Sequence, residues 1–205
     1  MSKILPIFAI LLLSLLLLWL LLAWDPAPIS ATSHDQLKLE AHPVGGEFAL
    51  NSAEGPVKLS DLKGKLVLLY FGYTACPDIC PTNLAIIALA LRELTRDELD
   101  AVQVVFVSVD PERDTPERLA TYVGYFHPRM IGLTGSAQAV AKAAKQYGAA
   151  YQRSDAGDSA MGYTIDHSAY TYVIDRSGRL AEVLGHATPA EEIVAILRHY
   201  LSAPD

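Results

Sequence analysis

The hydrophobic pattern of the chain begins with one long apolar segment. Residues 4–24, ILPIFAILLLSLLLLWLLLAW, follow Lys3 and include no charged side chain. A helix rises about 1.5 Å per residue, so a segment of this length reaches the roughly 30 Å needed to cross the hydrocarbon core of a bilayer. A secretory signal usually has a shorter apolar stretch of about 7–15 residues. The pattern therefore predicts one uncleaved transmembrane helix within residues 1–24.

The charges beside this segment predict its orientation. Lys3 precedes it, whereas Asp25 and Asp35 follow it, and positively charged flanks stay on the cytoplasmic side of a membrane. Nothing before the segment resembles an Arg-rich mitochondrial presequence. We therefore expect a single-pass protein of the bacterial cytoplasmic (inner) membrane, with its N-terminus in the cytoplasm and the rest on the periplasmic side. The stretch PAPISATS that follows the segment leaves late cleavage open.

The pattern changes twice after the apolar segment. Residues 25–43 contain prolines and few large apolar side chains, which is typical of a flexible tether. Residues 44–205 alternate short apolar runs with stretches of helical spacing, and a domain of this size builds a single core. Continuous apolar runs at 66–72 and 102–110 predict buried strands, and the stretch 81–94 between them has the spacing of a helix.

The remaining elements complete an α/β pattern. They are a smaller hairpin within 45–65 that turns at 54–56, a helix after Thr115, a short strand at 130–133, a helix from Ser136, a loop that includes 153–162, two strands within 169–186 that turn at 176–178, and a final helix over 188–201. Helices that alternate with buried strands predict an α/β sandwich. The closing pair of strands makes its central sheet mixed, and the N-terminal β-hairpin is an addition to it.

The net charge limits the class of partner. Outside the predicted anchor, residues 1–24, which includes Lys3, 15 of the 16 basic residues remain against 23 acidic residues, a balance of −8, and no basic run occurs. Nucleic acid binding is therefore not expected.

Cys76 and Cys80 are the only cysteines, and a proline follows each of them. Because proline has no backbone N–H, Pro81 fits before or within a first helical turn, which places Cys80 at a helix start. Near-helical residues four apart lie about 6 Å apart, which allows a disulfide or a shared ion, and helix-start N–H groups favour thiolate over thiol. A purely structural disulfide is less favoured, because so small a loop gains only about 2 kcal/mol from closure. Two buried, inert thiols are the other alternative.

One of the six histidines is a candidate partner of the cysteines. His167 follows a Gly-containing loop, at the mouth of the strand that begins near Ala169. In an α/β sheet, loops at strand ends gather where helices start, so this ring can face the two sulfurs across a crevice. The others have simpler interpretations, as residues of the tether, of a loop, of a solvated strand end or of the last helix: His34, His42, His127, His186 and His199.

A cluster of charges follows the second predicted strand: Asp110, Glu112, Arg113 and Asp114. Such a cluster raises the question of acid/base catalysis, but no cysteine or histidine accompanies it in sequence. We interpret it as a strand end, a turn and a capped helix with a local ion pair. In this interpretation the cluster helps to shape the crevice.

Three motifs, GYTACPDICP, VSVDPERDTPERL and DHSAYTYVIDRSGRL, together resemble the Sco/SenC family of membrane-anchored, thioredoxin-like copper proteins. The likeness runs from about Gly45 to Leu201. It implies a thioredoxin-like fold and carries the copper ligands of the family over to Cys76, Cys80 and His167. Two thiolates suit Cu(I), and an added imidazole suits Cu(II) as well. Zinc accepts this set too, but structural zinc sites generally add a fourth protein ligand.

Three other side chains are weaker candidates for a fourth ligand. Asp78 fits a helix cap equally well, and Asp166 adjoins His167, where neighbouring side chains diverge. Both carboxylates fit better as groups that support the metal ligands without binding the ion themselves. Met161 fits packing better than ligation. Three donors leave an ion open to incoming ligands, which suits transfer.

The resemblance also implies a role and partners. The family serves assembly of the dinuclear CuA centre of cytochrome c oxidase, so the expected target is oxidase subunit II, with another periplasmic copper chaperone as a candidate donor. We therefore expect a copper metallochaperone rather than an enzyme. The main alternative is a membrane-anchored thiol-disulfide oxidoreductase, in which Cys76 and Cys80 form a redox-active pair that keeps the target cysteines reduced. A thiol peroxidase and a redox or copper sensor are further alternatives.

Overall fold

The computed structural model describes three stretches of the chain: residues 11–19, 42–155 and 162–202. The chain divides into two units, Met1–Asp35 and Gln36–Asp205. In the first unit, residues 11–19 are helical. Among the described residues, no helix has both the length and the apolar character needed to cross a membrane. The rest of the predicted anchor and nearly all of the predicted tether, with His34, lie outside the described residues, so both stay predictions.

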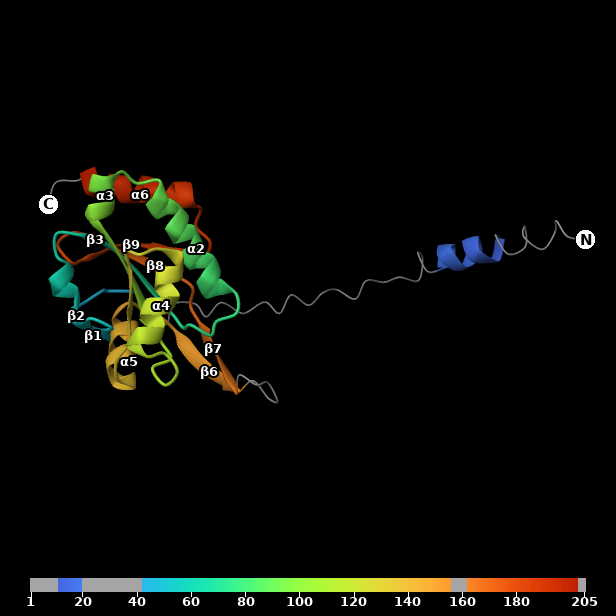
Figure 1. Ribbon diagram of the computed structural model, residues 1–205, viewed down its shortest axis with the longest axis horizontal. Coiled ribbons are helices and arrows are strands. Elements are labelled where there is room, and N and C mark those ends of the chain that lie inside the picture. Colours follow the sequence, from blue (N-terminus) through green and yellow to red (C-terminus); the bar gives the residue numbers. More distant parts are fainter. Residues whose placement is uncertain (1–10, 20–41, 156–161, 203–205) are drawn as a thin grey trace, which may run out of the picture. The chain divides into compact units, whose positions relative to one another are not determined.

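The second unit is built on a five-stranded sheet with the strand order β5-β4-β3-β8-β9 (Figure 1). Its strands are β3 (Leu66–Gly72), β4 (Val102–Ser108), β5 (Met130–Leu133), β8 (Thr171–Ile174) and β9 (Leu180–Leu184). Strand β4 pairs parallel with β3 and β5, whereas β8 pairs antiparallel with β3 and β9. The sheet is therefore mixed, as predicted. Every residue of β3 is buried, because this apolar strand is central and covered on both faces.

Helices cover both faces of this sheet. Those described in the second unit are α2 (Ile79–Arg92), α3 (Arg96–Asp100), α4 (Pro116–Phe126), α5 (Ala137–Gln146) and α6 (Ala190–Ser202). Alternate side chains of β3 point to opposite faces. Tyr70 stacks on Phe106, which contacts Tyr122 of α4, whereas Phe71 contacts Tyr147 at the end of α5. Helix α4 therefore covers one face and α5 the other, and α6 packs against α2 (Figure 1).

Local sequence signals explain where two of the helices begin. The Thr115 hydroxyl accepts a hydrogen bond from the Arg118 N–H at 3.2 Å, and the Ser136 hydroxyl accepts one from the Ala139 N–H at 3.2 Å. Each satisfies an N–H group that has no partner within its helix. Both predicted helix starts are confirmed.

The predicted N-terminal hairpin is present as β1 (Ala49–Ser52) and β2 (Gly55–Lys58), which pair antiparallel. Its turn lies at residues 53 and 54, one residue earlier than predicted, and Gly55 at the start of β2 has a φ of +126° that favours glycine. Asn51 and Thr134 exchange backbone hydrogen bonds of 2.7 and 2.9 Å, which attach the hairpin beside the end of β5. A short 3-10 helix, Leu59–Leu62, follows.

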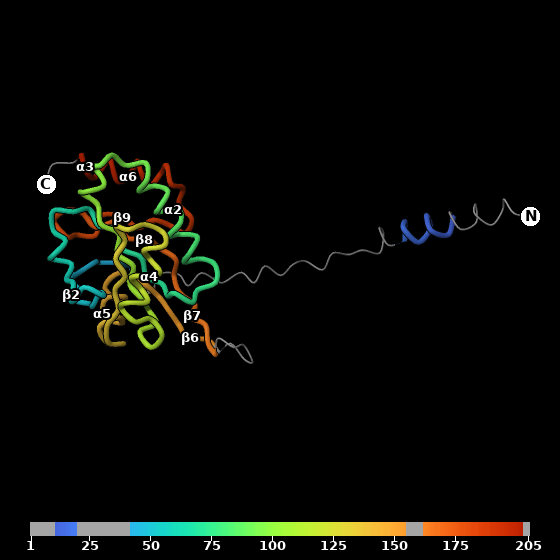
Figure 2. The backbone as a smooth tube through the Cα atoms, viewed as in Figure 1, coloured from blue at the N-terminus to red at the C-terminus, as the bar shows by residue number. Residues whose placement is uncertain are grey.

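The loop predicted over residues 153–162 was wrong in part, because residues 153–155 belong to a strand, and a second strand that was not predicted leads into His167. Strands β6 (Tyr151–Asp155) and β7 (Tyr163–His167) form a separate antiparallel hairpin that extends from the body of the domain (Figure 2). Ile165 and His167 are buried while Asp166 between them is exposed, which is the alternation of a strand. The rest of the predicted loop, up to Gly162, comes between the two strands in the sequence. His167 therefore ends β7, and the next strand, β8, begins only at Thr171.

Candidate metal centre

The two cysteines lie where the chain leaves the central strand and enters α2. Strand β3 ends at Gly72 and α2 begins at Ile79, so Cys80 lies in the first helical turn, as Pro81 predicted. Cys76 lies in the preceding loop, where its N–H donates to the Tyr73 carbonyl at 3.2 Å. Both are free thiols and both are buried, with exposed fractions of 8% for Cys76 and 0% for Cys80.

Gly72 leaves the space that the Cys80 sulfur occupies. A Cβ atom placed on Gly72 would lie 2.6 Å from the Sγ of Cys80 and 3.1 Å from the ring of Tyr70. Real Cβ atoms do not approach a neighbour so closely, so a side chain here would displace the sulfur. The glycine that ends β3 is therefore part of the site although it has no functional group.

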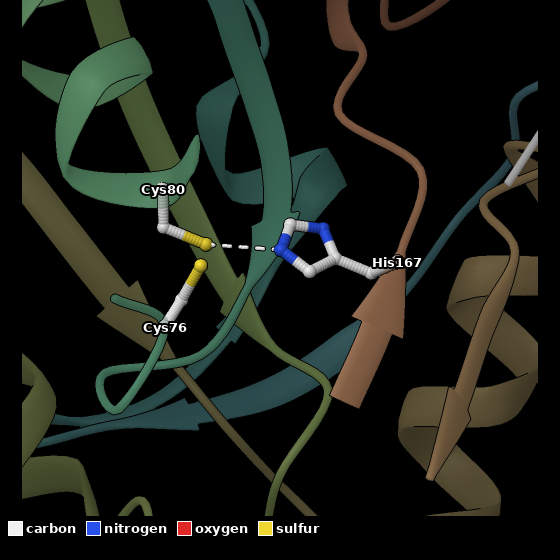
Figure 3. Close-up of side chains that lie close together, drawn as sticks. All are labelled: Cys76, Cys80 and His167. Atoms are coloured by element: carbon white, nitrogen blue, oxygen red, sulfur yellow. Dashed lines mark hydrogen bonds between the residues drawn. The ribbon is translucent and has the colours of Figure 1, made fainter. Parts of the chain in front are cut away.

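His167 completes a compact group with the two cysteines. Its Nε2 atom lies 3.1 Å from the Sγ of Cys80, and the three potential ligand atoms all lie within 4.8 Å of one another (Figure 3). The ring comes from the end of β7, and the cysteines come from the opposite side of the group (Figure 3). The structure thus brings together the three residues that the sequence nominated. No other group of His, Cys, Asp and Glu with this geometry occurs among the described residues.

The hydrogen bond at its other nitrogen orients the His167 ring. Nδ1 lies 3.0 Å from the backbone carbonyl of Ser168. A carbonyl only accepts, so Nδ1 carries a proton, and Nε2 is the ring nitrogen that faces the sulfurs. The edges of the Tyr70 and Tyr73 rings hold the imidazole, with ring centroids at 6.2 and 5.9 Å. The nitrogen that faces the sulfurs is therefore ready to bind a metal ion.

The environment makes the two thiols unequal. The pKa of Cys76 is lowered to about 4, chiefly because the Cys80 side chain hydrogen-bonds to its thiolate; His167 and the N–H groups of Asp78 and Cys80 add to this, while burial opposes it. The pKa of Cys80 is raised well above its ordinary value, first by burial and then by the hydrogen bond to Cys76 and its negative charge. Near neutral pH the pair therefore holds one thiolate at Cys76 and one thiol at Cys80.

This donor set fits a soft metal ion. Donors that share one ion at nitrogen and sulfur bond lengths of about 2.0–2.3 Å lie at most about 4.6 Å apart, so the observed group needs only small adjustments. Thiolates select soft ions such as Cu(I), and imidazole also suits Cu(II). The Cys80 proton must leave before that sulfur can bind as a thiolate.

Buried polar groups hold the two halves of the site together. The Asn83 amide, on α2, donates to the Ala169 carbonyl at 3.3 Å and accepts from the Ala187 N–H at 2.9 Å. It thereby connects the helix of Cys80 to the segment that follows His167. Asn83 is 4% exposed, so its amide has few alternative partners in water.

The weaker ligand candidates do not join the group. Asp78 is exposed at the N-cap position of α2, and its side chain makes no capping hydrogen bond. Asp166 is exposed on the other face of β7, where it accepts a hydrogen bond from the Ser154 hydroxyl at 2.7 Å. Met161 lies outside the described residues.

The other described histidines lie outside the group: His42, His127, His186 and His199. His42 and His199 are exposed, and His127 ends α4. The interpretation of His186 as a solvated ring was wrong in part. The residue is half-buried, and its Nδ1 is shielded from solvent without a hydrogen-bond partner.

The charged cluster after β4 makes the predicted local contacts and also a contact with a distant segment of the chain. The predicted local ion pair is present and joins Arg113 to Asp110, and the predicted capped helix is present as well. In addition, Asp114 is buried and accepts hydrogen bonds from the Thr74 N–H at 2.9 Å and the Thr74 hydroxyl at 2.5 Å. The cluster therefore holds the loop that carries Cys76, a contact across 40 residues that local sequence spacing does not reveal.

Sequence reasoning missed Gly72 and Asn83 as parts of the site. A glycine at the end of an apolar strand was one available signal, because glycine in a strand often marks a close approach. The other was a polar residue, Asn83, within the apolar stripe that includes Leu84 and Ile87. Such a residue is buried only if it has hydrogen-bond partners.

Comparison with known proteins identifies relatives of this chain. Residues 37–202 match the family described as SCO1/SenC. The mitochondrial SCO2 homolog of Mus musculus is 40% identical over 160 residues, which cover 77% of this chain and 62% of the length of the mouse protein. The solution structures of apo Sco1 from Thermus thermophilus match with a TM-score of 0.69 at 43% identity, over 79% of this chain and 93% of that one.

A second solved structure, Bradyrhizobium japonicum ScoI with copper bound, matches with a TM-score of 0.70 at 39% identity, over 77% of this chain and 99% of that one. The fold of this chain is thus the thioredoxin-like α/β fold of the Sco structures, with a central mixed sheet. The family match covers most of the chain, and the relatives match over nearly the whole described domain. The chain belongs to the SCO1/SenC family.

Proposed function

We propose that this protein is a copper metallochaperone that carries one copper ion on Cys76, Cys80 and His167. It hands the ion to the CuA centre of cytochrome c oxidase, with subunit II as the target, as the family resemblance implies. Another periplasmic copper chaperone is the proposed donor. The copper-bound ScoI of Bradyrhizobium japonicum, a relative at 39% identity, supports copper as the ion.

The observation that carries this proposal is the convergence of two sulfurs and one imidazole nitrogen within 4.8 Å. Two thiolates satisfy Cu(I), and Nε2 of His167 adds the donor that Cu(II) requires. Among the described residues no fourth protein ligand joins the group. An ion held by three protein donors keeps a coordination position open. Ligands of a target protein can therefore bind the ion before the three donors release it.

The proposal includes a location. The CuA target and the charges around residues 4–24 support a protein anchored in a bacterial cytoplasmic membrane, with the domain on the periplasmic side. A tether over residues 25–43 would let the domain reach a membrane-bound partner.

The unequal thiols support a second candidate function, reduction of the target cysteines. The Cys76 thiolate would attack a disulfide of the target and form a mixed disulfide, releasing one target thiolate. After losing its proton, Cys80 would attack Cys76, releasing the second target thiolate and leaving a Cys76–Cys80 disulfide. Two electrons pass to the target, and both of its cysteines are left ready to bind copper.

Spectroscopy of the copper-loaded domain tests the first function. We expect about one copper per chain, with two sulfurs and one nitrogen by X-ray absorption. His167→Ala should weaken Cu(II) binding far more than Cu(I) binding. His199→Ala, at an exposed position on α6, is the matched control and should change neither. Equal retention of both copper ions by His167→Ala would contradict the proposed ligand set.

Activity of the same variants separates the two functions. Reduction of a subunit II disulfide without copper needs Cys76 and Cys80 but not His167. A metallochaperone instead loses Cu(II) transfer when His167 is replaced. Two results together would favour the reductase. The His167→Ala variant would reduce the subunit II disulfide at the wild-type rate, and the wild type would transfer no copper.

A further inference from the structure

The hairpin that carries His167 is joined to the domain at several points along its length. Strands β6 and β7 pair only with each other, so no ladder of the central sheet holds them. At the base, the Ser168 N–H donates to the Ala150 carbonyl at 2.8 Å, and the Ala150 N–H donates to the Ser168 hydroxyl at 3.1 Å. Midway, the Ile165 N–H donates to the Tyr73 hydroxyl at 3.3 Å.

The far end of the hairpin is held by Tyr163, which begins β7. The Tyr163 hydroxyl donates to Asp110 at 2.7 Å, and its carbonyl accepts from the Arg113 guanidinium at 3.0 Å. Arg113 in turn pairs with Asp110. We name these three residues, Asp110, Arg113 and Tyr163, the hairpin-end cluster. It is a closed set of contacts between β7 and the segment that follows β4.

Two cations also enclose the ring of Tyr163. The guanidinium carbon of Arg113 lies 3.7 Å from the ring centroid, and that of Arg153, on β6, lies 3.5 Å from it. Arg153 pairs with Glu112 at 3.1 Å, so the outer cation is linked to the same segment after β4. Such stacked cations are attracted by the negative charge on the face of an aromatic ring. The ring is therefore fixed in position by contacts on both sides and at its hydroxyl.

The geometry of a strand transmits this position to His167. Residues 163, 165 and 167 point to one face of β7, because successive side chains alternate. Four residues of strand span roughly 13 Å, and antiparallel pairing with β6 keeps β7 straight over that length. A shift of the hairpin end thus tilts the imidazole toward or away from the sulfurs.

We propose that the hairpin-end cluster is a positioning device that holds His167 within bonding distance of the cysteines. Tyr163 and Arg113 touch no donor atom and act through β7. This inference rests on the proposed copper site and adds residues that set how firmly its nitrogen ligand is held. Since Cu(I) is satisfied by two thiolates and Cu(II) needs the imidazole, the cluster discriminates between the two ions.

Three variants of the full chain test this inference. Tyr163→Ala removes both the ring and the hydroxyl, and we expect it to weaken Cu(II) binding about tenfold to 100-fold, the usual effect of losing a group that orients a ligand. Cu(I) affinity should stay within about threefold, because both thiolates remain. Tyr163→Phe keeps the stacked ring and should restore most of the Cu(II) affinity. Tyr125→Ala, which removes a tyrosine that is 87% exposed on α4, is the control and should change neither ion.

The readouts are Cu(II) and Cu(I) affinities from competition with chelators, and the nitrogen hyperfine splitting of the Cu(II) electron paramagnetic resonance spectrum. Thermal unfolding without copper checks that each variant is folded. Equal loss of both ions, or an unchanged Cu(II) affinity and spectrum in folded Tyr163→Ala, would overturn the inference. If Tyr163→Ala does not fold, Tyr163→Phe decides: a Cu(II)-selective loss of about threefold supports the cluster and no loss overturns it.

The same measurements separate this inference from the proposed function. Wild-type protein whose Cu(II) spectrum contains no nitrogen splitting from His167 would refute the copper site itself. Wild-type protein with that splitting, and a folded Tyr163→Ala variant identical to it, would refute only the positioning role.

Discussion

The Nε2 atom of His167 lies 3.1 Å from the Sγ of Cys80, although 87 positions separate the two residues in the chain. One comes from a hairpin outside the central sheet, and the other comes from the first turn of α2. The unfolded chain has no means of keeping these atoms together. A copper ion bound by all three donors therefore binds the folded state in preference, and its binding is coupled to folding.

Replacement of Gly72 tests how closely the sheet packs against the site. In Gly72→Ala, the added Cβ would lie 2.6 Å from the Sγ of Cys80 and 3.0 Å from the ring of Phe106. We expect the free energy of unfolding to fall by about 1–3 kcal/mol and copper affinity to fall because the sulfur is displaced. Denaturant unfolding and copper competition measure the two effects.

Gly124→Ala is the matched control for this substitution. Nothing lies within 4 Å of a Cβ at Gly124, which is inside α4. Alanine there should stabilise the protein by about 0.5–1 kcal/mol and leave copper binding unchanged. Wild-type copper affinity in Gly72→Ala would show that the site adapts to the added methyl group.

The lowered pKa of Cys76 predicts an unusual reactivity profile. With a pKa of about 4, Cys76 is a thiolate throughout the neutral range, so its rate of alkylation by iodoacetamide should be nearly constant above about pH 5. An ordinary thiol, with a pKa of about 8.5, reacts faster as the pH rises through that value. Rates at each cysteine can be followed by mass spectrometry of the metal-free protein.

The cause of the shift can be tested in the same assay. The hydrogen bond from Cys80 makes the largest contribution to the lowered pKa of Cys76, so Cys80→Ala should raise that pKa and move the profile toward higher pH. A Cys76 profile with an ordinary midpoint in the wild type would contradict the described environment of the thiols.

Copper(I) binding should release a proton near neutral pH. Cys76 is already a thiolate, with a pKa of about 4, whereas the raised pKa of Cys80 keeps its thiol protonated. Binding through both sulfurs therefore displaces one proton, and the apparent affinity should rise about tenfold per pH unit as long as Cys80 is protonated. Below the pKa of Cys76 two protons must leave, so the dependence becomes steeper. Calorimetry in buffers of different ionisation enthalpy counts the protons, and release of none would exclude a protonated Cys80.

The Asn83 amide predicts a link between stability and the site. Asn83→Ala leaves the Ala169 carbonyl and the Ala187 N–H without their partner. We expect a loss of about 2 kcal/mol in the free energy of unfolding and slightly weaker Cu(II) binding, because Ala169 lies two residues after His167. Leu89→Ala, at a half-exposed position on the same helix, is the control and should cost much less. A variant as stable as the wild type would mean that water replaces both hydrogen bonds.

Much of the fold and part of the site follow from local sequence. The apolar residues of β3 predict a buried strand, because strands that are covered on both faces have nearly continuous apolar sequences. Thr115 with Pro116, and Ser136, predict helix starts because capping depends on only a few adjacent residues. Pro81 predicts the position of Cys80 for the same reason. The spacing of the two cysteines and the motif around His167 nominated three residues that the fold does bring together.

The rest depends on contacts between distant segments. Only the folded chain places Asp114 against Thr74 and Asp110 against Tyr163, since these pairs lie 40 and 53 positions apart. The strands β6 and β7 were not expected, because each is short and gains its stability from its partner and from the domain rather than from its own composition.

By itself, the sequence determined the reactive groups, most of the order of strands and helices, and the position of Cys80 at a helix start, because these depend on residues within a turn or two of one another. The tertiary structure alone decided that His167 meets the sulfurs, that Gly72 leaves room for them, and that Tyr163 can hold the hairpin in place. Those relations require chain segments to pack at van der Waals distance, and the energies that select such packing are shared among many distant residues.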